Sequence, residues 1–434
     1  MGNETSYTYD KVGNTLSITD ALGNKTYKEY NSLNLPVKTV FNDGSVNTYT
    51  YDSAGRLTVT TDAKGNTQKR AYDANGNLIK LTDKNGESVD YEYDAMGNLT
   101  GVTDPMGYKT TYAYDVNGNL ISTTDALGNI SSMEYNHTFP AYESDKKGDG
   151  RRLDYDNLGR IVRKMEFSGA ENFFTYDSVG NVTESMDTFR NKTLYSYDSA
   201  NRLLSVTDKE GNTTSYRYAP SGQIGQITGA DGSVIQKTYD KNARLISEKD
   251  GLGSEIKYEY DKLGRLTKEI YPDGSFKTFS YDSMGNLLSV TDEEGSVYSY
   301  EYDSVGNMVK STDPTGGVTL YEYDNNNNLI KLINVKDGKN LTTSFEYDKK
   351  NRLIKKTNAL GNSVKYTYNA LNLVEKTDED GFKTTYSYDE NSNLIKEAYA
   401  DGESVSYTYK MEICLRATVI NREEQAMSLT LKEE

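Results

Sequence analysis

The side chains that most often carry out catalysis are scarce in this sequence. Its 434 residues include one histidine, His137, and one cysteine, Cys414. His137 could act as a general base, but it lies in a variable turn position, and no serine or cysteine nucleophile stands in a recognisable motif. Cys414 lies between Ile413 and Leu415, where an isolated cysteine usually packs as a small apolar side chain. The sequence therefore predicts no enzymatic activity.

Carboxylates are abundant, and they suggest two kinds of site. Aspartate recurs along the chain and would bind Ca²⁺ if its oxygens converged, yet the best calcium loop, Asp145–Gly150, places Lys147 at a ligand position. Because capping of backbone turns accounts for the same aspartates, we predict no metal and no cofactor. Glutamates on one face of the expected strands could be mistaken for a glycosidase pair, but their spread over seven repeats favours a solvated surface. These glutamates are Glu29, Glu92, Glu134, Glu259, Glu301, Glu322 and Glu346.

Composition excludes several classes of protein. The net charge of −16, from 49 basic and 65 acidic residues, disfavours nucleic acid or anionic lipid as the main partner. A single cysteine cannot form an intrachain disulfide. There is no run of 18 apolar residues, and residues 1–14 lack the basic and apolar regions of a signal peptide, so we expect neither a membrane span nor a signal peptide. The apolar fraction of 35% requires either disorder or a fold that buries tyrosine in place of aliphatic residues.

A tyrosine recurs along nearly the whole chain and sets its organisation. The step between successive copies is constant in all but three intervals, which is the signature of a repeat protein. The repeat tyrosines are Tyr9, Tyr30, Tyr51, Tyr72, Tyr93, Tyr114, Tyr135, Tyr155, Tyr176, Tyr197, Tyr218, Tyr239, Tyr260, Tyr281, Tyr302, Tyr323, Tyr347, Tyr368, Tyr388 and Tyr409. We assign these twenty repeats to residues 1–410. Residues 411–434 form a tail without repeats, in which Arg422–Met427 has a composition that tolerates helix.

Each repeat contains two turns with recognisable chemistry. Asp94 precedes Gly97 by three residues in one turn, and Asp104 precedes Gly107 in the next. Aspartate caps backbone N–H groups and glycine adopts positive φ, so both patterns predict type I turns that end in a left-handed glycine and join two strands of a hairpin. We assign the tyrosine, aspartate and glycine of the first turn as the structural repeat motif. Its best-kept residues are Tyr51, Asp52, Gly55, Tyr72, Asp73, Gly76, Tyr93, Asp94, Gly97, Tyr114, Asp115, Gly118, Tyr281, Asp282, Gly285, Tyr302, Asp303 and Gly306.

Five repeats replace the second turn by an Asp-Gly pair. These pairs are Asp43-Gly44, Asp231-Gly232, Asp273-Gly274, Asp337-Gly338 and Asp401-Gly402. Four of them keep the glycine at the same distance from the repeat tyrosine as in a standard second turn. We interpret them as an alternative, contracted loop that still requires glycine at that position.

The segments between turns are about six residues long, near the usual length of a strand. Fifteen of the 20 repeat tyrosines follow an aromatic residue by two positions, with a polar or small residue between. This alternation places the rings on one face and the acids on the other. We expect the rings to stack across neighbouring strands. Examples are Tyr91, Tyr93, Tyr112 and Tyr114.

The second segment of each repeat carries apolar residues at both parities. Leu203 follows a first turn, while Leu204 and Val206 share the opposite parity. Twenty repeats of two strands give ~40 strands, more than an open sheet holds without curling. We therefore predict an all-β fold in which hairpins of about 21 residues form a long curled antiparallel sheet, a partial shell. A β-propeller would need about ten four-stranded blades, beyond the usual four to eight. Residues 136–150 interrupt the pattern, and we expect a frayed edge or gap there.

The motif resembles the YD repeat, also called the RHS repeat. Tyr72–Leu78 followed by Thr82–Gly86 shows the pattern Tyr-Asp-x-x-Gly-Asn/Arg-Leu and then Thr-Asp-x-x-Gly, and the match extends over nearly all of the repeat region. The family includes bacterial Rhs polymorphic toxins, wall-associated proteins, the C subunits of Tc toxins and teneurins. The resemblance implies a hollow β-shell, which in the toxins encloses a C-terminal toxin polypeptide.

Toxin members of this family end their shell with a core that cleaves itself near an Asp-Pro-x-Gly signature. Asp104–Gly107 and Asp313–Gly316 resemble that signature but lie in the register of ordinary second turns, so we interpret them as turns. The chain therefore resembles a fragment of such a protein, with neither core nor toxin.

The resemblance implies a non-catalytic structural shell segment of a secreted or cell-surface protein, within a toxin-encapsulating or contact-dependent competition system. The partners it implies are an encapsulated C-terminal toxin polypeptide, neighbouring shell segments or glycans. The alternative is an extracellular carbohydrate- or protein-binding module, in which rows of tyrosine would stack on sugar rings. As a fragment, the chain is expected to retain cargo weakly and to associate through its terminal strands.

Overall fold

The described part of the chain is built from β-strands alone. The computed structural model describes residues 4–410, 413–420 and 427–430, the last two ranges by their backbone only. It contains 41 strands, and no helix occurs in these ranges. The all-β antiparallel fold that the repeats predict is confirmed.

The chain divides into two compact units, and each unit combines segments that are far apart in the sequence. Unit 1 comprises Met1–Arg70, Asp83–Asn85 and Lys192–Leu341. Unit 2 comprises Ala71–Thr82, Gly86–Asn191 and Thr342–Glu434. Two strands cross a boundary between the units, namely β7 (Thr67–Tyr72) and β33 (Lys339–Tyr347).

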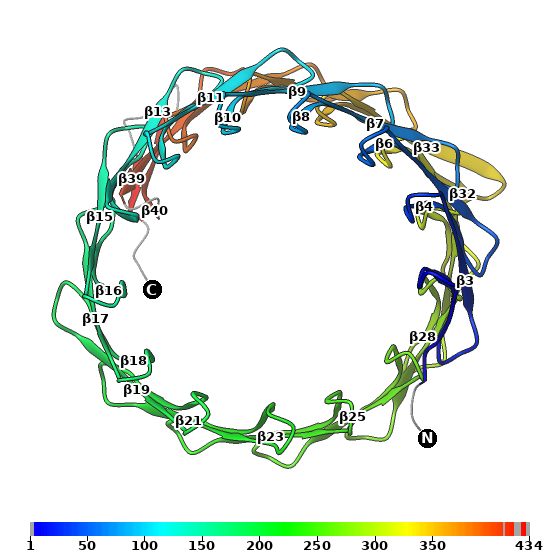
Figure 1. Cartoon of the computed structure of the whole chain (residues 1–434), viewed down its shortest axis with the longest axis horizontal. Helices are drawn as coiled ribbons and strands as arrows, with labels where there is room; N and C mark the ends of the chain where they lie inside the picture. Colours follow the sequence, from blue (N-terminus) through cyan, green and yellow to red (C-terminus); the bar gives the residue numbers. More distant parts are fainter. Residues whose placement is uncertain (1–3, 411–412, 421–426, 431–434) are drawn as a thin grey trace. The chain divides into compact units, whose positions relative to one another are not determined.

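The remaining strands of unit 1 form an early and a late group. The early group is β1 (Ser6–Tyr9), β2 (Thr15–Thr19), β3 (Lys25–Tyr30), β4 (Pro36–Val40), β5 (Val46–Tyr51) and β6 (Leu57–Thr61). The late group is β19 (Lys192–Tyr197), β20 (Leu203–Thr207), β21 (Thr213–Tyr218), β22 (Ile224–Thr228), β23 (Val234–Tyr239), β24 (Leu245–Lys249), β25 (Glu255–Tyr260), β26 (Leu266–Ile270), β27 (Phe276–Tyr281), β28 (Leu287–Thr291), β29 (Val297–Tyr302), β30 (Met308–Thr312), β31 (Val318–Tyr323) and β32 (Leu329–Lys336). In Figure 1 the late group follows a continuous arc.

Unit 2 is divided in the same way. Its early group is β8 (Leu78–Thr82), β9 (Ser88–Tyr93), β10 (Leu99–Thr103), β11 (Lys109–Tyr114), β12 (Leu120–Thr124), β13 (Ile130–Asn136), β14 (Phe139–Ser144), β15 (Gly150–Tyr155), β16 (Ile161–Met165), β17 (Glu171–Tyr176) and β18 (Val182–Met186). Its late group is β34 (Leu353–Thr357), β35 (Ser363–Tyr368), β36 (Leu373–Thr377), β37 (Lys383–Tyr388), β38 (Leu394–Ala398), β39 (Ser404–Lys410), β40 (Ile413–Ile420) and β41 (Met427–Thr430).

In the described strand pairs, strands pair with their sequence neighbours, and a bulge follows the first turn. Strand β9 pairs antiparallel with β10, and the register shifts between Leu99 and Gly101. Tyr93 therefore lies opposite Leu99, and Tyr91 lies opposite Val102. A bulge of this kind inserts one extra residue into one strand, here residue 100, so apolar positions three residues apart reach the same face.

This bulge corrects the parity inferred for the second segment. In β20, Leu203 lies opposite Tyr197 and Val206 lies opposite Tyr195, so Leu203 and Val206 share the tyrosine face. Leu204, which the alternation groups with Val206, is instead 37% exposed. Strict period two fails here because the extra residue of the bulge shifts every later position by one.

The two-faced character of the strands is confirmed, but the rings of β9 are not stacked on those of the next repeat. In β9, Asp90 and Glu92 are exposed, while Tyr91 and Tyr93 are partly buried. Within the described residues these rings do not stack on those of the next repeat, such as Tyr114. Equivalent tyrosines lie on every second strand and are therefore about 9.5 Å apart, beyond the ~4.5–7 Å separation of paired rings.

The predicted gap at residues 136–150 is also wrong. Strand β13 pairs with β14, and β14 pairs with β15. The chain closes the β13–β14 hairpin with a turn between Asn136 and Phe139, in which His137 adopts φ +59° in place of the usual glycine. A shorter turn thus maintains the pairing without the Tyr-Asp-x-x-Gly motif.

Four of the five Asp-Gly pairs are ordinary turns rather than contracted loops. The amide of Gly232 donates to the carbonyl of Gly229, as Gly107 does to Asp104 in a standard repeat. Only the identity of the first residue has changed, because the backbone hydrogen bond needs no side chain there. Asp337-Gly338 is the exception: both residues have positive φ, as in a two-residue hairpin turn.

The tail continues the sheet where it is described. Strand β39 pairs with β40, and β40 pairs with β41. Most of the helix-tolerant stretch, residues 422–426, lies outside the described residues, as does the side chain of Cys414. In the part of the chain that the structure describes, no helix is long and apolar enough to cross a membrane.

Glycine at the first turn permits a direct test of the backbone requirement. Gly97 has φ +87° and no atom closer than 4.0 Å to the position of an added Cβ, so a substitution there acts through the backbone alone. We expect Gly97→Val to destabilise the protein by at least about 1–2 kcal/mol and to lower the midpoint of thermal unfolding. Gly97→Asn should be milder, because Asn201 and Asn351 adopt positive φ at equivalent positions. Equal effects of the two variants would contradict this account.

Candidate functional site

The aspartate of the motif holds the first turn together. Asp94 Oδ1 accepts hydrogen bonds from the amides of Met96 and Asn98, each at 2.9 Å, and Oδ2 accepts one from Asn98 Nδ2 at 2.9 Å. The amide of Gly97 donates to the Asp94 carbonyl at 3.1 Å. The hydrogen bonds from Asn98 hold the pKa of Asp94 below its ordinary value. The stability that this carboxylate provides is therefore present above the ordinary pKa of aspartate, ~3.9, and is lost as the pH falls through the lowered value.

The tyrosine of the motif joins one hairpin to the preceding one. Tyr93 Oη donates to the carbonyl of Leu78 at 3.0 Å. Leu78 and Tyr93 lie at the end of the paired strands β8 and β9, past the pair formed by Lys80 and Asp90. Burial raises the pKa of Tyr93, so the hydroxyl keeps its proton. The same bond to the residue 15 positions earlier recurs in Tyr30, Tyr51, Tyr114, Tyr135, Tyr176, Tyr218, Tyr239, Tyr260, Tyr281 and Tyr323.

The residue after the motif glycine reaches forward to the next repeat. The guanidinium of Arg265 lies 4.8 Å from the centre of the Tyr281 ring, and its Nη1 donates to the Asp282 carbonyl at 2.8 Å. Its Nε also binds Asp261 at 2.6 Å. The same placement over the tyrosine of the next repeat occurs for Arg160, Arg202, Arg244 and Arg352. Sequence reasoning missed this contact, although the Asn/Arg alternation at that position was its signal.

The motif residues therefore recur along the sheet and do not converge on one site. The tyrosines close strands β5, β7, β9, β11, β27 and β29, and the aspartates and glycines form the turns that follow. Each set contacts its own turn and an adjacent repeat, and Asp303 also contacts a distant segment through Lys64. Their geometry stabilises a repetitive wall, and four of them, Asp282, Tyr302, Asp303 and Gly306, also line one cavity of unit 1.

Exposed glutamates on the other face are partnered by lysine. Glu322 lies directly opposite Lys331, and its carboxylate is 2.7 Å from the lysine Nζ. Glu29, Glu301 and Glu346 pair with the lysine nine residues later in the same way, and Glu92 pairs with Lys109. These carboxylates are spread along the sheet, as predicted. The nine-residue spacing between these glutamates and their lysines is the sequence signal for this pairing.

Contacts between turns join the two strand groups of unit 1. Lys64 Nζ, in the turn after β6, lies 3.1 Å from Asp303 Oδ2, in the turn after β29. One repeat further, Asn85 Nδ2 donates to Asp324 Oδ2 at 2.9 Å. A cavity of about 670 Å³ lies beside these contacts, and its lining includes Asp62. Polar turn residues thus connect segments about 240 positions apart.

The charged stretch at residues 145–149 connects the two strand groups of unit 2. Lys147 forms an ion pair with Asp389, whose side chain is only 8% exposed, and Asn391 Nδ2 donates to Asp145 Oδ2 at 2.5 Å. Lys146 pairs with the buried Asp125 at 2.7 Å. Burial acts to raise the pKa of Asp389, but the bonds from Lys147 and its neighbours outweigh it and the pKa is lowered. We call this group of contacts the unit 2 clasp.

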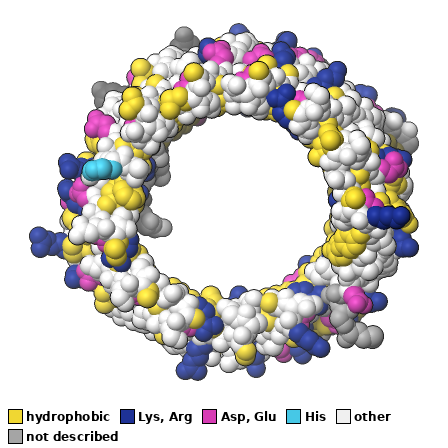
Figure 2. Space-filling view, in the orientation of Figure 1, with side chains coloured by type: hydrophobic (Ala, Val, Ile, Leu, Met, Phe, Trp, Pro, Cys, Tyr) yellow, Lys and Arg dark blue, Asp and Glu magenta, His cyan; other side chains and the backbone are white. Residues whose placement is uncertain are grey.

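The other sequence candidates occupy ordinary or peripheral places. Asp104 and Asp313 cap second turns through the amides of Met106 and Thr315, as interpreted. His137 is exposed, and its Nδ1 lies 2.9 Å from Asn136 Oδ1. Figure 2 shows this histidine at the surface among interspersed basic and acidic side chains. Within the described residues, no group of three or more His, Cys, Asp or Glu side chains is placed to hold a metal ion.

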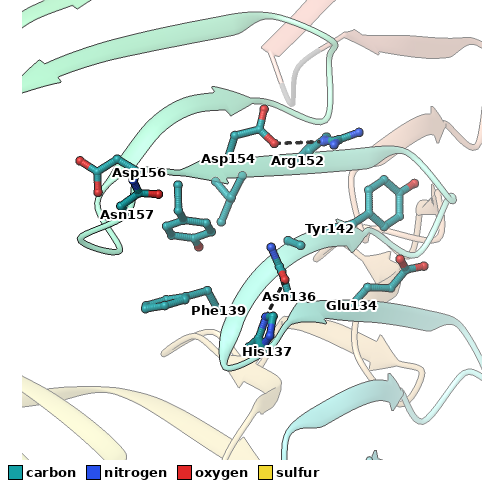
Figure 3. Close-up of a pocket in the computed structure, with 12 residues that line it drawn as sticks. Glu134, Asn136, His137, Phe139, Tyr142, Arg152, Asp154, Asp156 and Asn157 are labelled. Carbon is teal, nitrogen blue, oxygen red and sulfur yellow. Dashed lines mark hydrogen bonds and ion pairs between the residues drawn. The ribbon is translucent and has the colours of Figure 1, made fainter.

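A second cavity, of about 910 Å³, lies in unit 2 where the motif is interrupted (Figure 3). Strands β13, β14 and β15 contribute its walls. Phe139 and Tyr155 meet at one end with ring centres 5.1 Å apart, and Glu134 and Tyr142 lie at the other. This cavity is the strongest candidate for a binding site within unit 2.

The fold and the repeat geometry agree with one family of known proteins. A model of the teneurin YD-shell family matches residues 2–125, 82–230 and 231–414 of the chain. The chain belongs to the teneurin YD-shell family. No curated protein matches this YD-shell chain in sequence.

Solved structures show the same fold. The YD-shell chain is similar to TcdB2-TccC3-TEV, with 17% identity and a TM-score of 0.51, over 97% of this chain and 30% of that chain. It is similar to TcdB2-TccC3-Cdc42 with 16% identity and a TM-score of 0.52, over 98% and 30%. It is also similar to the Tc holotoxin pore of Photorhabdus luminescens, with 16% identity and a TM-score of 0.51, over 100% of this chain and 30% of that chain. The chain thus spans about a third of the length of these structures.

The tyrosine hydroxyl gives a test of the inter-hairpin contact. Tyr93→Phe should cost about 0.5–1.5 kcal/mol in the free energy of unfolding, because the Leu78 carbonyl loses its donor. Tyr91→Phe is the matched control, since the Tyr91 hydroxyl forms no hydrogen bond among the described residues. Urea unfolding followed by circular dichroism measures both. A loss of the same size in the control would refute the assignment.

The unit 2 clasp gives a second test. Lys147→Met should leave the buried Asp389 carboxylate without its cation and speed hydrogen exchange of the amides in β37. The expected loss of local stability is about 1–3 kcal/mol. Lys331→Met removes an ion pair whose glutamate is 46% exposed, and should cost less than about 1 kcal/mol. Unchanged exchange in β37 of the Lys147 variant would show that the clasp does not stabilise unit 2.

Proposed function

We propose that this YD-shell chain is a structural wall segment of a secreted or cell-surface protein that encloses a polypeptide, and that it has no enzymatic activity of its own. The observation that carries the proposal is that the motif side chains form their hydrogen bonds within the wall itself. Hydroxyls such as that of Tyr93 and carboxylates such as that of Asp94 bind the backbone of their own and neighbouring hairpins. Side chains arranged in this way support a wall and leave little polar chemistry for a substrate.

The family and the solved structures support the same role. A teneurin YD-shell model matches nearly the whole chain, and the fold is shared with chains of TcdB2-TccC3. By this likeness we infer an enclosed C-terminal toxin polypeptide, or neighbouring shell segments, as the partner, within a toxin-encapsulating or contact-dependent competition system. A secreted or cell-surface location is part of this proposal.

A second candidate function is binding of a glycan or protein at the wall surface. The observation that favours it is the ring pair of Tyr7 and Tyr9 on β1, whose centres are 6.3 Å apart and whose planes differ by 22°. These side chains are 50% and 58% exposed, unlike the partly buried tyrosines of later repeats. Two exposed, stacked rings offer a surface on which a sugar ring or an apolar side chain could pack.

The two functions are separated by a test of which face meets a polypeptide. A photo-crosslinking amino acid is placed at Tyr91 or at Glu92, adjacent residues on opposite faces of β9, in the chain fused at its C-terminus to an unfolded polypeptide. A wall that encloses the polypeptide should crosslink to it from one of the two positions only. Crosslinks of equal yield from both positions, or from neither, would overturn the enclosure proposal. Glycan binding that is lost in Tyr7→Ala would support the alternative.

A further inference from the structure

The cavity of unit 2 lies where the wall departs from its repeat. The β13–β14 hairpin closes through the short turn between Asn136 and Phe139 in place of an Asp-x-x-Gly turn, and the Asp156–Gly159 turn after β15 borders the cavity on this side. The resulting hollow of about 910 Å³ is within the range of ligand-binding pockets, ~300–1,000 Å³. Figure 3 shows Glu134, Tyr142 and Arg152 around it on three neighbouring strands.

Glu134 lacks the lysine that several of its counterparts have. In four other repeats the strand glutamate is bound by a lysine nine residues later, as Glu301 is by Lys310 at 2.7 Å. Nine residues after Glu134 stands Glu143, which is itself paired with Arg151. The residue directly opposite Glu134 is Tyr142, and Glu134 has no ion pair among the described residues.

The remaining charges of the cavity are compensated within the protein. Arg152 Nε lies 3.2 Å from Asp154 Oδ1, and Asp154 Oδ2 lies 3.1 Å from Arg163 Nη1. Asp156 is bound by Arg160 at 2.7 Å. The carboxylate of Glu134 is therefore the one lining carboxylate that has no cationic partner within the described structure. A cationic ligand would supply the kind of pairing that Glu29, Glu301, Glu322 and Glu346 have.

Aromatic rings provide the rest of the site. The Tyr142 ring packs directly against the backbone of Gly150. A Cβ added at Gly150 would collide with the ring, so glycine is required for this contact. Phe139 is 45% exposed and offers an apolar surface. A ring beside a carboxylate suits an ammonium group, which is attracted by both the charge and the ring face. The protein uses such a contact elsewhere, with Lys268 Nζ 4.2 Å from the Phe276 ring centre.

We propose that this cavity binds a lysine side chain of an extended polypeptide. The ammonium group lies between the Glu134 carboxylate and the Tyr142 ring, and an adjacent apolar residue of the polypeptide packs on Phe139. The volume accommodates more than one side chain, which favours a peptide over a free amine, and the net charge of −16 attracts a basic segment. This inference is independent of the enclosure proposal, because it concerns one cavity within unit 2.

A titration with defined probes tests the proposal. The probes are a pentapeptide with a central lysine flanked by apolar residues, the same peptide with norleucine in place of lysine, and Nα-acetyl-lysine amide, each followed by ligand-observed NMR with the full chain. The lysine peptide should bind at least about fivefold more tightly than the norleucine peptide, and Glu134→Gln should weaken it by a similar factor. Tyr142→Leu should weaken binding about threefold, whereas Tyr142→Phe should retain it, because the ring face is kept.

Matched variants keep the result interpretable. Glu322→Gln removes a carboxylate that Lys331 already occupies, and should leave binding unchanged. Circular dichroism of each variant confirms that it remains folded. The lysine amide should bind more weakly than the peptide; equal affinity would show a small-amine site and overturn the polypeptide assignment. Equal binding of the lysine and norleucine peptides, or a Glu134→Gln chain that binds as the unaltered chain does, would overturn the site itself.

Discussion

The left-handed glycine turn capped by aspartate is the constraint on which the rest of this structure depends. Gly97 at φ +87° lets the chain reverse within four residues, and Asp94 satisfies the amides that the reversal leaves unpaired. The turn places Leu99 opposite Tyr93, and the bulge that follows Leu99 brings Val102 opposite Tyr91 on the same face. The register of each hairpin, and the face on which its apolar side chains lie, therefore follow from one turn.

Polar contacts replace the apolar core that most domains of this length possess. Among the described residues, the one fully buried apolar side chain is that of Ala370. In place of a core, hairpins are tied to the previous one by a tyrosine hydroxyl such as that of Tyr281, and, where an arginine follows the motif glycine, to the next one by that arginine, as with Arg265. Because every tie reaches an adjacent repeat, stability accumulates along the sheet as it does in other repeat proteins.

Departures from the repeat are the places where the chain acquires chemistry that the motif does not supply. The charged stretch around Lys147 departs from the usual turn composition and forms the unit 2 clasp between distant segments. A cavity lies beside the short turn at His137, and in it Glu134 lacks the lysine that four other repeats provide. The first departure is used within the protein, and the second is the one on which the proposed lysine site rests.

The sequence by itself determined the strands, the two turns of each repeat and the family. The constant period of the tyrosines and the Asp-x-x-Gly spacing report local backbone requirements, which act within a single turn or strand and so appear directly in the residue order. The alternation of Tyr91 and Glu92 likewise gave the two faces, because side chains alternate along any strand.

The tertiary structure alone decided how the repeats meet. Ring stacking failed because equivalent tyrosines are separated by an intervening strand, and parity failed at Leu204 because a bulge adds a residue that no composition marks. The partners of Lys64 and Lys147 lie about 240 positions away, beyond the reach of any local pattern. The cavity at Glu134 was hidden for the same reason: its lining comes from three strands, and the missing lysine becomes visible only once the strands are in register.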